Sequence, residues 1–254
     1  MTRLGVVVPA FRPDTARLET YLRALVDELD PETVRVELDD PDSETLRRLS
    51  ALDVPVVELN AVPYRRGKGA AITAGFEALE SELDWLAFAD ADGSTSPSEF
   101  ARVVGALTDS DVSVGSRRHP QSHVLGHQTF ARRFLGDGFS WLARRLLDAK
   151  LYDYQCGAKA ITADAWRSVR EHLYEPGFSW DVELLAMAAA LALDITEVPI
   201  EWEDKPGSTV SPVWTTLSMG KALLVARHRA KRLQNSPLHD VFARDDEIAL
   251  INRK

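Results

Sequence analysis

Short apolar runs alternate with helix-length amphipathic segments through the first 116 residues, and this alternation most narrows the folds open to the chain. The apolar runs have the length of strands and cover residues 4–10, 34–38, 56–59, 85–89 and 112–114. The segments between them have helical periodicity and cover residues 14–29, 43–49, 70–79 and 97–107. Strands and helices in alternation form open parallel sheets. We therefore predict an α/β fold, a mostly parallel central sheet flanked by helices, with its site in the loops at the carboxyl ends of the strands.

The second half of the chain has longer helical segments. Helices are predicted at residues 130–147 and 181–193, and strands at 158–162 and 195–202. These elements are expected to complete the sheet and to cover the site. Because the chain has no internal repeat, low-complexity tract or linker, residues 1–210 are predicted to form a single domain. Residues 211–254 are predicted to be an amphipathic basic helix and a polar tail of the same unit.

Composition excludes several classes of protein. With 254 residues, of which 45% are hydrophobic, the chain can bury a full core. Its net charge of −9 disfavours nucleic acid as a partner, because phosphate backbones need a basic surface. The acidity, with Arg outnumbering Lys, resembles that of proteins from salt-loving microbes. The single cysteine, Cys156, excludes an internal disulfide and is predicted to be a small buried apolar residue.

The relation of the chain to membranes follows from its apolar runs. No run is long enough to span a bilayer, and the chain enters its first predicted strand without a signal peptide, so we expect a cytoplasmic protein that is soluble or peripheral. The helical segment 211–232 combines apolar residues such as Trp214 with a basic end containing Arg227, Arg229, Lys231 and Arg232. This combination fits an element on an anionic membrane surface. It fits equally well a helix docked on the core with a solvated basic end.

Two carboxylates directly follow the strand predicted at 85–89, in the sequence Asp90-Ala91-Asp92-Gly93. At the rim of a sheet they supply hard oxygen ligands, which Mg²⁺ and Mn²⁺ prefer, and such an ion can bridge them to a diphosphate. Aspartate and glycine after a strand also form ordinary turns and helix caps. The motif alone leaves both interpretations open, and the neighbouring loops decide between them.

Two of these loops carry cations. The sequence Arg66-Gly67-Lys68-Gly69 opens a predicted helix, so its glycines would let backbone amides approach an anion while Lys68 adds charge at the positive end of the helix. Arg117 follows the strand predicted at 112–114, and a planar forked donor suits phosphate oxygens. Turns and solvated surface side chains also explain both patterns. If the site is real, Lys68 and Arg117 are expected to serve phosphates and not the fold.

Three histidines, His119, His123 and His127, recur at a four-residue spacing that would suit a metal site on a helix. Pro120 and Gly126 disfavour a helix here, and no carboxylate stands at the matching spacing. The segment is therefore predicted to be a loop without a metal.

The order of these motifs resembles that of the family 2 glycosyltransferases with a GT-A fold, and within them the dolichyl-phosphate sugar synthases, closest to the dolichyl-phosphate β-glucosyltransferase branch. The resemblance runs from Val6 to about Ser211. Besides residues 66–71 and the Asp90/Asp92 pair, it is carried by the segments Val6-Val7-Val8-Pro9-Ala10-Phe11, Leu38-Asp39-Asp40-Pro41-Asp42-Ser43, Gly115-Ser116-Arg117, Asp153-Tyr154-Gln155-Cys156-Gly157-Ala158-Lys159, Phe178-Ser179-Trp180-Asp181-Val182-Glu183-Leu184 and Trp202-x-x-x-Pro206-Gly207-Ser208. Pro41 stands where the family has glycine, and Ala158 where it has phenylalanine.

The resemblance implies an inverting transfer of a hexose, glucose favoured, from a nucleotide sugar, UDP-sugar favoured, to a polyprenyl or dolichyl monophosphate at the inner face of the cell membrane. It implies Mg²⁺ or Mn²⁺ on Asp90 and Asp92. It assigns the donor nucleotide to Pro9, Ala10, Phe11, Asp39, Asp40, Lys68 and Asp90. It assigns the acceptor phosphate to Arg117, Arg132, Arg133 and Gln155, and catalysis to Asp92, Asp153, Asp181 and Arg117. A phosphate monoester is largely a dianion at neutral pH and needs little help from a general base.

Other functions stay open on the residues alone. A family 2 glycosyltransferase with a sugar hydroxyl as acceptor shares the same motifs, and the changed loop at Pro41 also fits a non-catalytic subunit that binds a nucleotide sugar or a lipid. A sugar-phosphate nucleotidyltransferase is disfavoured, because Pro9-Ala10-Phe11-Arg12-Pro13 follows the first strand in place of a glycine-rich loop.

Overall fold

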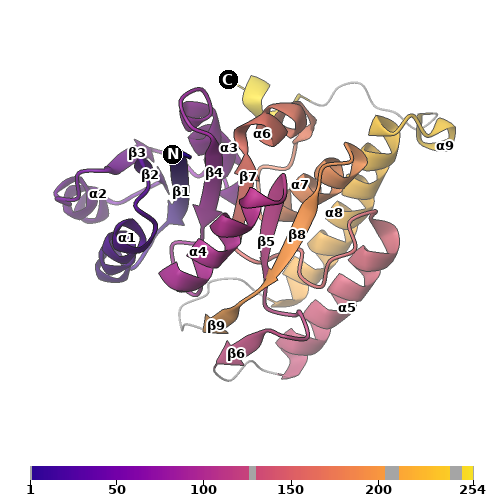
Figure 1. Ribbon diagram of the computed structural model, residues 1–254, viewed down its shortest axis with the longest axis horizontal. Helices are drawn as coiled ribbons and strands as arrows, with labels where there is room; N and C mark the ends of the chain where they lie inside the picture. Colours follow the sequence, from indigo (N-terminus) through magenta and orange to yellow (C-terminus); the bar gives the residue numbers. More distant parts are fainter. Residues whose placement is uncertain (1, 126–129, 204–211, 241–247, 254) are drawn as a thin grey trace.

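The computed structural model describes residues 2–125, 130–203, 212–240 and 248–253. Within these ranges the side chains at 125, 130–135, 212–218, 238 and 240 are not described. The described part forms a central sheet with helices on both faces (Figure 1). The predicted α/β class with a mostly parallel sheet is confirmed.

The main sheet has seven strands in the order β3-β2-β1-β4-β7-β5-β8. Their bounds are β1 (Leu4–Phe11), β2 (Thr33–Asp39), β3 (Val57–Val62), β4 (Trp85–Ala89), β5 (Val112–Ser116), β7 (Ala158–Thr162) and β8 (Ile195–Pro199). The pairs β1·β2, β1·β4, β2·β3 and β5·β8 are parallel. Only β7 runs the other way, antiparallel to both β4 and β5. The carboxyl ends of β1, β4 and β5 therefore meet the amino end of β7 at one edge of the sheet.

Successive residues of a strand lie in two separate cores, because their side chains point to opposite faces of the sheet. On one face Val6 and Ala87 pack with α1 (Thr15–Leu29), α2 (Ser43–Ser50) and α4 (Pro97–Gly105). On the other face Val7 and Phe88 belong to a larger core. Its helices are α3 (Lys68–Leu79), α5 (Phe130–Leu146), α6 (Ala163–Val169), α7 (Trp180–Ala190) and α8 (Pro212–Leu233). Short helical turns η1 (Ala106–Thr108), η2 (Arg170–His172), α9 (Pro237–Asp240) and η3 (Leu250–Asn252) complete the described elements.

A second sheet of two parallel strands, β6 (His123–Leu125) and β9 (Glu201–Glu203), lies beyond the end of β5 (Figure 1). The strand predicted at 195–202 is divided between β8 and β9, because Ile200 donates its amide to Ser116 at the end of β5 and the chain then turns to β6. The prediction of a loop around the histidines is thus wrong for His123, which begins β6. His127 lies outside the described residues. The helix predicted to 193 ends at Ala190.

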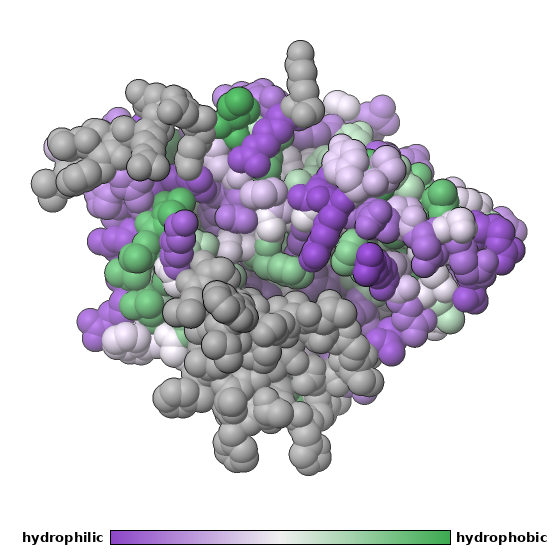
Figure 2. All heavy atoms as spheres, turned by 180° about the vertical axis from the view of Figure 1, so that it is seen from behind, coloured by the Kyte–Doolittle hydropathy of each residue, from purple (hydrophilic) through white to green (hydrophobic). Residues whose placement is uncertain are grey.

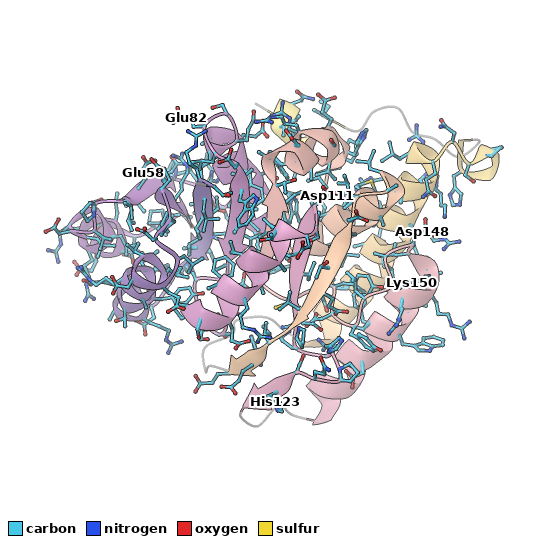
Figure 3. All side chains as sticks on the ribbon, in the orientation of Figure 1. Glu58, Glu82, Asp111, His123, Asp148 and Lys150 are labelled. Carbon is cyan, nitrogen blue, oxygen red and sulfur yellow. The ribbon has the colours of Figure 1, made fainter. Side chains whose placement is uncertain are left out.

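The described part of the C-terminal segment packs on the domain. Met219, Leu223, Ala226 and Ala230 of α8 lie in the larger core, and Leu250 donates its amide to Leu173 O. Asp148, labelled in Figure 3 just beyond the end of α5, pairs with Lys231 of α8 at 2.9 Å. In the view from behind, a run of hydrophobic residues lies on the left side of the surface, the side that α8 occupies (Figure 2). No helix in the described ranges is both long enough and apolar enough to cross a membrane. Cys156 is buried as predicted.

Candidate active site

The loop after β4 carries Asp90 and Asp92 and is fixed from three sides. Within the loop, Asp92 Oδ1 accepts the Ser94 amide at 2.9 Å, and Gly93 takes a positive φ of 65° that favours glycine. From α1, the Tyr21 hydroxyl donates to Thr95 O at 3.0 Å. From β9, the Glu203 amide donates to Ser94 O at 3.2 Å. Burial, together with the charges of Asp90 and Asp92, raises the pKa of Tyr21, so its hydroxyl remains a donor.

The Asp90 carboxylate is held between a lysine and a glycine. Lys68 Nζ lies 2.9 Å from Asp90 Oδ1, and the Asp90 amide donates to Gly157 O at 2.9 Å. A Cβ atom on Gly157 would lie 1.8 Å from Asp90 Oδ2, so only glycine leaves room for the carboxylate. Although 42% of the Asp90 side chain is exposed, protein surrounds its inner side, and this burial raises its pKa against the opposing Lys68 charge. Asp90 is thus oriented before any ligand arrives.

We expect Gly157→Ala to lower the affinity of the Asp90/Asp92 pair for Mn²⁺ by about 10–100-fold, the range for disturbing a group that orients a metal ligand. The added methyl group would push the Asp90 carboxylate out of its position. Isothermal titration calorimetry measures the affinity. Gly105→Ala is the matched control, because a Cβ atom there meets nothing within 4 Å and its φ of −61° is helical. Equal affinities for the two variants would contradict the assignment.

The Gly-Lys-Gly loop owes its glycines to packing against another segment of the chain. A Cβ on Gly67, whose φ is +99°, would lie 2.5 Å from Pro176 O, and one on Gly69 would lie 2.6 Å from Glu175 O. The Ala70 amide donates to Pro176 O at 3.1 Å. Both glycines therefore let the first turn of α3 lie against residues 175–177, and this contact fixes the backbone position of Lys68. The expectation that they also open the backbone to an anion stays a prediction.

Lys68 joins the Asp90 loop to α7. Its ammonium lies 3.0 Å from Asp181 Oδ2, and Asp181 Oδ1 accepts from Lys159 at 2.7 Å. Asp181 is 2% exposed, so burial alone would raise its pKa, but Lys159 and Lys68 lower it below the ordinary value. Burial likewise opposes the Lys68 charge, and Asp181 and Asp90 overcome this, so its pKa is raised and the ammonium persists. Asp181, which was predicted to be catalytic, is therefore buried and contacts the Lys68 ammonium.

Arg117 and Asp153 form a buried bidentate pair beside the end of β5. Arg117 Nε donates to Asp153 Oδ2 at 2.6 Å and Nη2 donates to Oδ1 at 3.0 Å. Burial raises the pKa of Asp153, but Arg117 more than offsets this, so the net pKa is well below the ordinary value. Glu197 of β8 accepts the Asp153 amide at 2.8 Å and so fixes its backbone. Lys68 and Arg117, which were expected to serve phosphates and not the fold, each also neutralise a buried carboxylate of the fold, and their contact with a phosphate stays a prediction.

Arg118 and the predicted acceptor residue Gln155 lie beside this pair. Arg118 Nη1 is 3.6 Å from Asp153 Oδ2, and its Nε donates to Asp137 of α5 at 3.2 Å. Gln155 donates its amide to Asp153 Oδ1 at 3.0 Å and is partly exposed. The side chains of Arg132 and Arg133 lie outside the described residues.

The predicted nucleotide-binding residues lie at the ends of β1 and β2. Phe11 is flanked by two guanidinium groups, Arg65 at 4.2 Å and Arg12 at 5.1 Å from its ring centre. Asp39 is buried and accepts the amides of Arg66 at 2.7 Å and Gly67 at 2.9 Å. Asp40 is exposed, Pro9 is partly exposed and Ala10 is buried. Asp39 thus holds the start of the Gly-Lys-Gly loop, a contact that sequence reasoning did not foresee.

The donor set fits a divalent ion that is shared with a substrate. Among the residues that the structure describes, no three or more Cys, His, Asp or Glu side chains are arranged to hold a metal ion by themselves. Mg²⁺ is usually bound by one or two carboxylates together with substrate phosphates and waters. Asp90 and Asp92 supply two such carboxylates, and the Asp92 charge acts directly on Asp90. The residues present therefore fit Mg²⁺ or Mn²⁺ held jointly with a diphosphate.

Sequence reasoning missed Lys159, Glu197 and Tyr21 as supports of the site. Lys159 had a signal: a lysine in the apolar strand Ala158–Thr162 must find a buried partner. Glu197 in β8 had a weaker signal of the same kind. Tyr21 looked like an ordinary core residue of α1, and nothing in the sequence pointed from it to the Asp90 loop.

Comparison with solved structures shows the fold. Glucosyl-3-phosphoglycerate synthase from Mycobacterium tuberculosis, crystallised with Mn²⁺, UDP and phosphoglyceric acid, superimposes with a TM-score of 0.64 over 93% of this chain and 80% of that one, at 17% identity. The same enzyme crystallised with Mg²⁺ and UDP also gives a TM-score of 0.64, over 93% of this chain and 80% of that one, at 18% identity. Both are GT-A fold glycosyltransferases.

Comparison with curated proteins gives closer relatives. The dolichyl-phosphate beta-glucosyltransferase of Drosophila melanogaster is 33% identical over 63% of this chain and 51% of its own length. The enzyme of the same name from Dictyostelium discoideum is 27% identical over 89% of this chain and 74% of its own length. The glycosyltransferase AglD of Haloferax volcanii is 28% identical over 87% of this chain and 36% of its own length. The chain spans about half the length of the Drosophila enzyme and of the enzymes of the same name from Mus musculus and Homo sapiens.

Family membership follows from the part of the chain that carries the site. The model of the family described as glycosyl transferase family 2 matches residues 6–165, more than half of the chain. That range includes Lys68, Asp90, Asp92, Arg117 and Asp153. The chain belongs to glycosyl transferase family 2.

Proposed function

We propose that this chain transfers glucose from UDP-glucose to a polyprenyl or dolichyl monophosphate, with inversion at the anomeric carbon and with Mg²⁺ or Mn²⁺ as cofactor. The observation that carries the proposal is the Asp90/Asp92 pair at the end of β4 together with two cations at the same end of the sheet. Lys68 lies 2.9 Å from Asp90, and Arg117 follows β5, which is separated from β4 by β7. The names of relatives that are 32–33% identical supply the sugar and the acceptor.

The donor diphosphate belongs at Asp90 and Asp92. A divalent ion on these two carboxylates supplies a positive charge that stabilises the nucleotide diphosphate as it leaves. Lys68 adds a fixed cation next to that position, and it requires no rearrangement because Asp181 already holds it. Phe11 and the two guanidinium groups that lie over its ring, Arg65 and Arg12, offer planar groups at the end of β1 near which the nucleotide base is expected to pack.

The acceptor phosphate belongs beside Arg117. A dianionic phosphate oxygen is already a nucleophile, so the protein must screen repulsion between two anions and need not remove a proton. The backbone amide, Nε and Nη2 of Arg117 all donate to Asp153. Its Nη1 group is the one that we assign to the phosphate. Neither Asp153 nor Asp181 is free to act as a base, because each is buried in an ion pair. This arrangement supports a phosphate acceptor over a sugar hydroxyl.

The proposal is tested by incubating the chain with UDP-glucose, a polyprenyl phosphate and Mn²⁺ and identifying lipid products by mass spectrometry. We expect a glucosyl phosphoryl polyprenol that fails to form when the metal is chelated. In parallel reactions, GDP-mannose replaces UDP-glucose, or a soluble sugar replaces the polyprenyl phosphate. Formation of a glycosylated soluble sugar without any glycolipid would refute the lipid acceptor and favour a sugar hydroxyl.

A lipid acceptor requires the chain to approach a membrane, and we infer that α5 makes this contact at the inner face of the cell membrane. Three of the four basic residues at the end of α8 have partners within the fold: Arg227 donates to Leu146 O, Arg229 pairs with Glu183, and Lys231 pairs with Asp148. These contacts leave less free charge on α8 than the sequence suggested. On α5, Trp141 is 62% exposed, and Arg145 lies over its ring at 5.4 Å. An exposed tryptophan with a basic neighbour suits the headgroup region of an anionic bilayer.

We expect Trp141→Ser to weaken binding to vesicles that contain phosphatidylserine by at least about tenfold, because burial of a large apolar side chain contributes about 1.5–3 kcal/mol. Sedimentation of the protein with vesicles measures the binding. Tyr64→Ser is the control, since Tyr64 is 61% exposed but follows β3 at the other edge of the sheet. High salt should weaken wild-type binding as it screens Arg145. Equal binding by both variants would remove α5 from the contact.

A further inference from the structure

Four charged side chains form a continuous chain from the core to the site. Lys159 Nζ lies 2.7 Å from Asp181 Oδ1, and Lys68 Nζ lies 3.0 Å from Asp181 Oδ2. Lys68 Nζ also lies 2.9 Å from Asp90 Oδ1. The charges alternate in sign, so each group neutralises its neighbours. Of the four side chains, Asp90 is the most exposed, at 42%.

The inner pair of this chain is fully enclosed. Lys159 is 1% exposed and Asp181 is 2% exposed, and Lys159 also donates to Cys156 O at 2.7 Å. Both ammonium groups lie over the Phe88 ring, Lys68 at 5.2 Å and Lys159 at 5.6 Å from its centre. A buried ion pair generally stabilises a protein no more than apolar residues of the same size would. Stability therefore gives little reason for the pair, and its position behind Lys68 suggests another.

A lysine needs such support to act as a fixed charge. Its ammonium sits on a flexible four-carbon stem, and holding it in one place costs rotamer entropy. Asp181 provides a second, buried anchor opposite Asp90, so Lys68 stays at the carboxylate when solvent competes. Lys159 in turn occupies the other oxygen of Asp181 and fixes the rotamer of that carboxylate.

We propose that Asp181 and Lys159 are positioning residues: Asp181 holds the Lys68 ammonium beside Asp90, Lys159 holds Asp181, and Lys68 alone of the three contacts the donor diphosphate. The proposal rests on the proposed function, in which a nucleotide diphosphate binds at Asp90 and Asp92. It assigns to Asp181 a role other than that of a base, because both of its carboxylate oxygens accept from ammonium groups.

A double-mutant cycle with UDP and Mn²⁺ tests the proposal through binding, without turnover. Isothermal titration calorimetry would compare the wild type, Asp181→Asn, Lys68→Met and the double variant. We expect Asp181→Asn to weaken UDP binding about tenfold, the lower range for groups that orient a metal or phosphate ligand. In the Lys68→Met background the same change should have less than about a twofold effect, because a residue that acts through Lys68 loses its influence when Lys68 is gone.

Glu183→Gln is the matched control. Glu183 is a second buried carboxylate of α7, but it accepts the amides of Tyr174 and Glu175 and pairs with Arg229, without contact to Lys68. Any effect of this variant on UDP binding should be the same with and without Lys68. Because Asp181→Asn leaves Lys159 with an incomplete partner, the neutral pair Lys159→Met with Asp181→Asn is a second variant that removes both buried charges together. We expect it to weaken UDP binding as Asp181→Asn does.

Three results would overturn the proposal: UDP binding unchanged in the neutral pair variant, equal losses from Asp181→Asn with and without Lys68, or a coupling for Glu183 as large as that for Asp181. If the wild type does not bind UDP with Mn²⁺, the proposed donor is wrong, and the cycle is then measured with inorganic pyrophosphate and Mn²⁺. Additive losses in that cycle, or no pyrophosphate binding by the wild type, would overturn the positioning role as well.

Discussion

Asp92→Asn is expected to lower turnover of UDP-glucose at saturating Mn²⁺ by at least about a hundredfold, because removal of a direct metal ligand should exceed the 10–100-fold cost of losing only its outer partners. The substitution is nearly isosteric. The asparagine oxygen can still accept the Ser94 amide that Asp92 Oδ1 accepts at 2.9 Å, so the loop keeps its shape. The substitution removes one negative charge from the proposed cation site. Rates of glycolipid formation at increasing Mn²⁺ concentration measure the effect.

Asp111→Asn is the matched control for this experiment. Asp111 precedes β5, at the edge of the sheet opposite the site, and is labelled in Figure 3. Its Oδ2 accepts the Asp194 amide at 2.9 Å, and asparagine can do the same. We expect normal turnover from Asp111→Asn and an unchanged melting temperature for both variants. If Asp92→Asn kept more than half of the wild-type rate, the metal assignment would be wrong.

Arg117→Met is expected to destabilise the protein by about 3 kcal/mol, since removing one partner of a buried ion pair leaves an uncompensated charge. Asp153 has no exposed surface, and Arg118 is the only other cation near it among the described side chains, at 3.6 Å. Urea unfolding followed by circular dichroism measures the change. Arg167→Met is the control: Arg167 is 44% exposed in its pairs with Glu80 and Asp164, and surface pairs contribute under about 1 kcal/mol.

The double variant Arg117→Met with Asp153→Asn separates the two roles of the arginine. Without either charge, the core should recover most of its stability, but turnover should stay low because the acceptor phosphate has lost its cation. Unfolding of Arg117→Met at the wild-type urea concentration would show that the pair does not support the fold. Normal turnover by a stable double variant would show that Arg117 does not serve the acceptor.

The difference in stability between the wild type and Arg117→Met depends on pH. The pKa of Asp153 is lower in the folded protein than in the unfolded chain, so the pair's contribution is fully present above the unfolded value of about 3.9. It is lost as the pH falls toward the lower folded value. In folded Arg117→Met, burial without the arginine raises the pKa of Asp153, so the variant regains stability as Asp153 takes up a proton. The stability gap between wild type and Arg117→Met should therefore begin to narrow above about pH 4 and shrink further as the pH falls.

The sequence by itself determined the layered α/β fold and the place of the Asp90/Asp92 pair. The runs at 85–89 and 158–162 coincide with β4 and β7, because a short apolar run bounded by turn residues is typical of a buried strand. Asp90 and Asp92 had to fall at the end of β4 for the same reason. The local order of residues carries these features, so periodicity and motif spacing were enough to predict them.

Only the tertiary structure decided which charges act together. Lys68 and Asp181 are separated by 113 positions, and Arg117 and Asp153 by 36, so no periodicity links them. The antiparallel entry of β7 between β4 and β5 brings Lys159 and Gly157 beneath Asp90, and the contact of residues 175–177 with α3 explains both glycines around Lys68. Arg229 and Lys231 at the basic end of α8 pair with Glu183 and Asp148, where the sequence had left a membrane surface and a docked helix equally open. Burial decides these pairings, because a charge removed from water must find its partner wherever the fold brings one, and sequence distance has no bearing on that requirement.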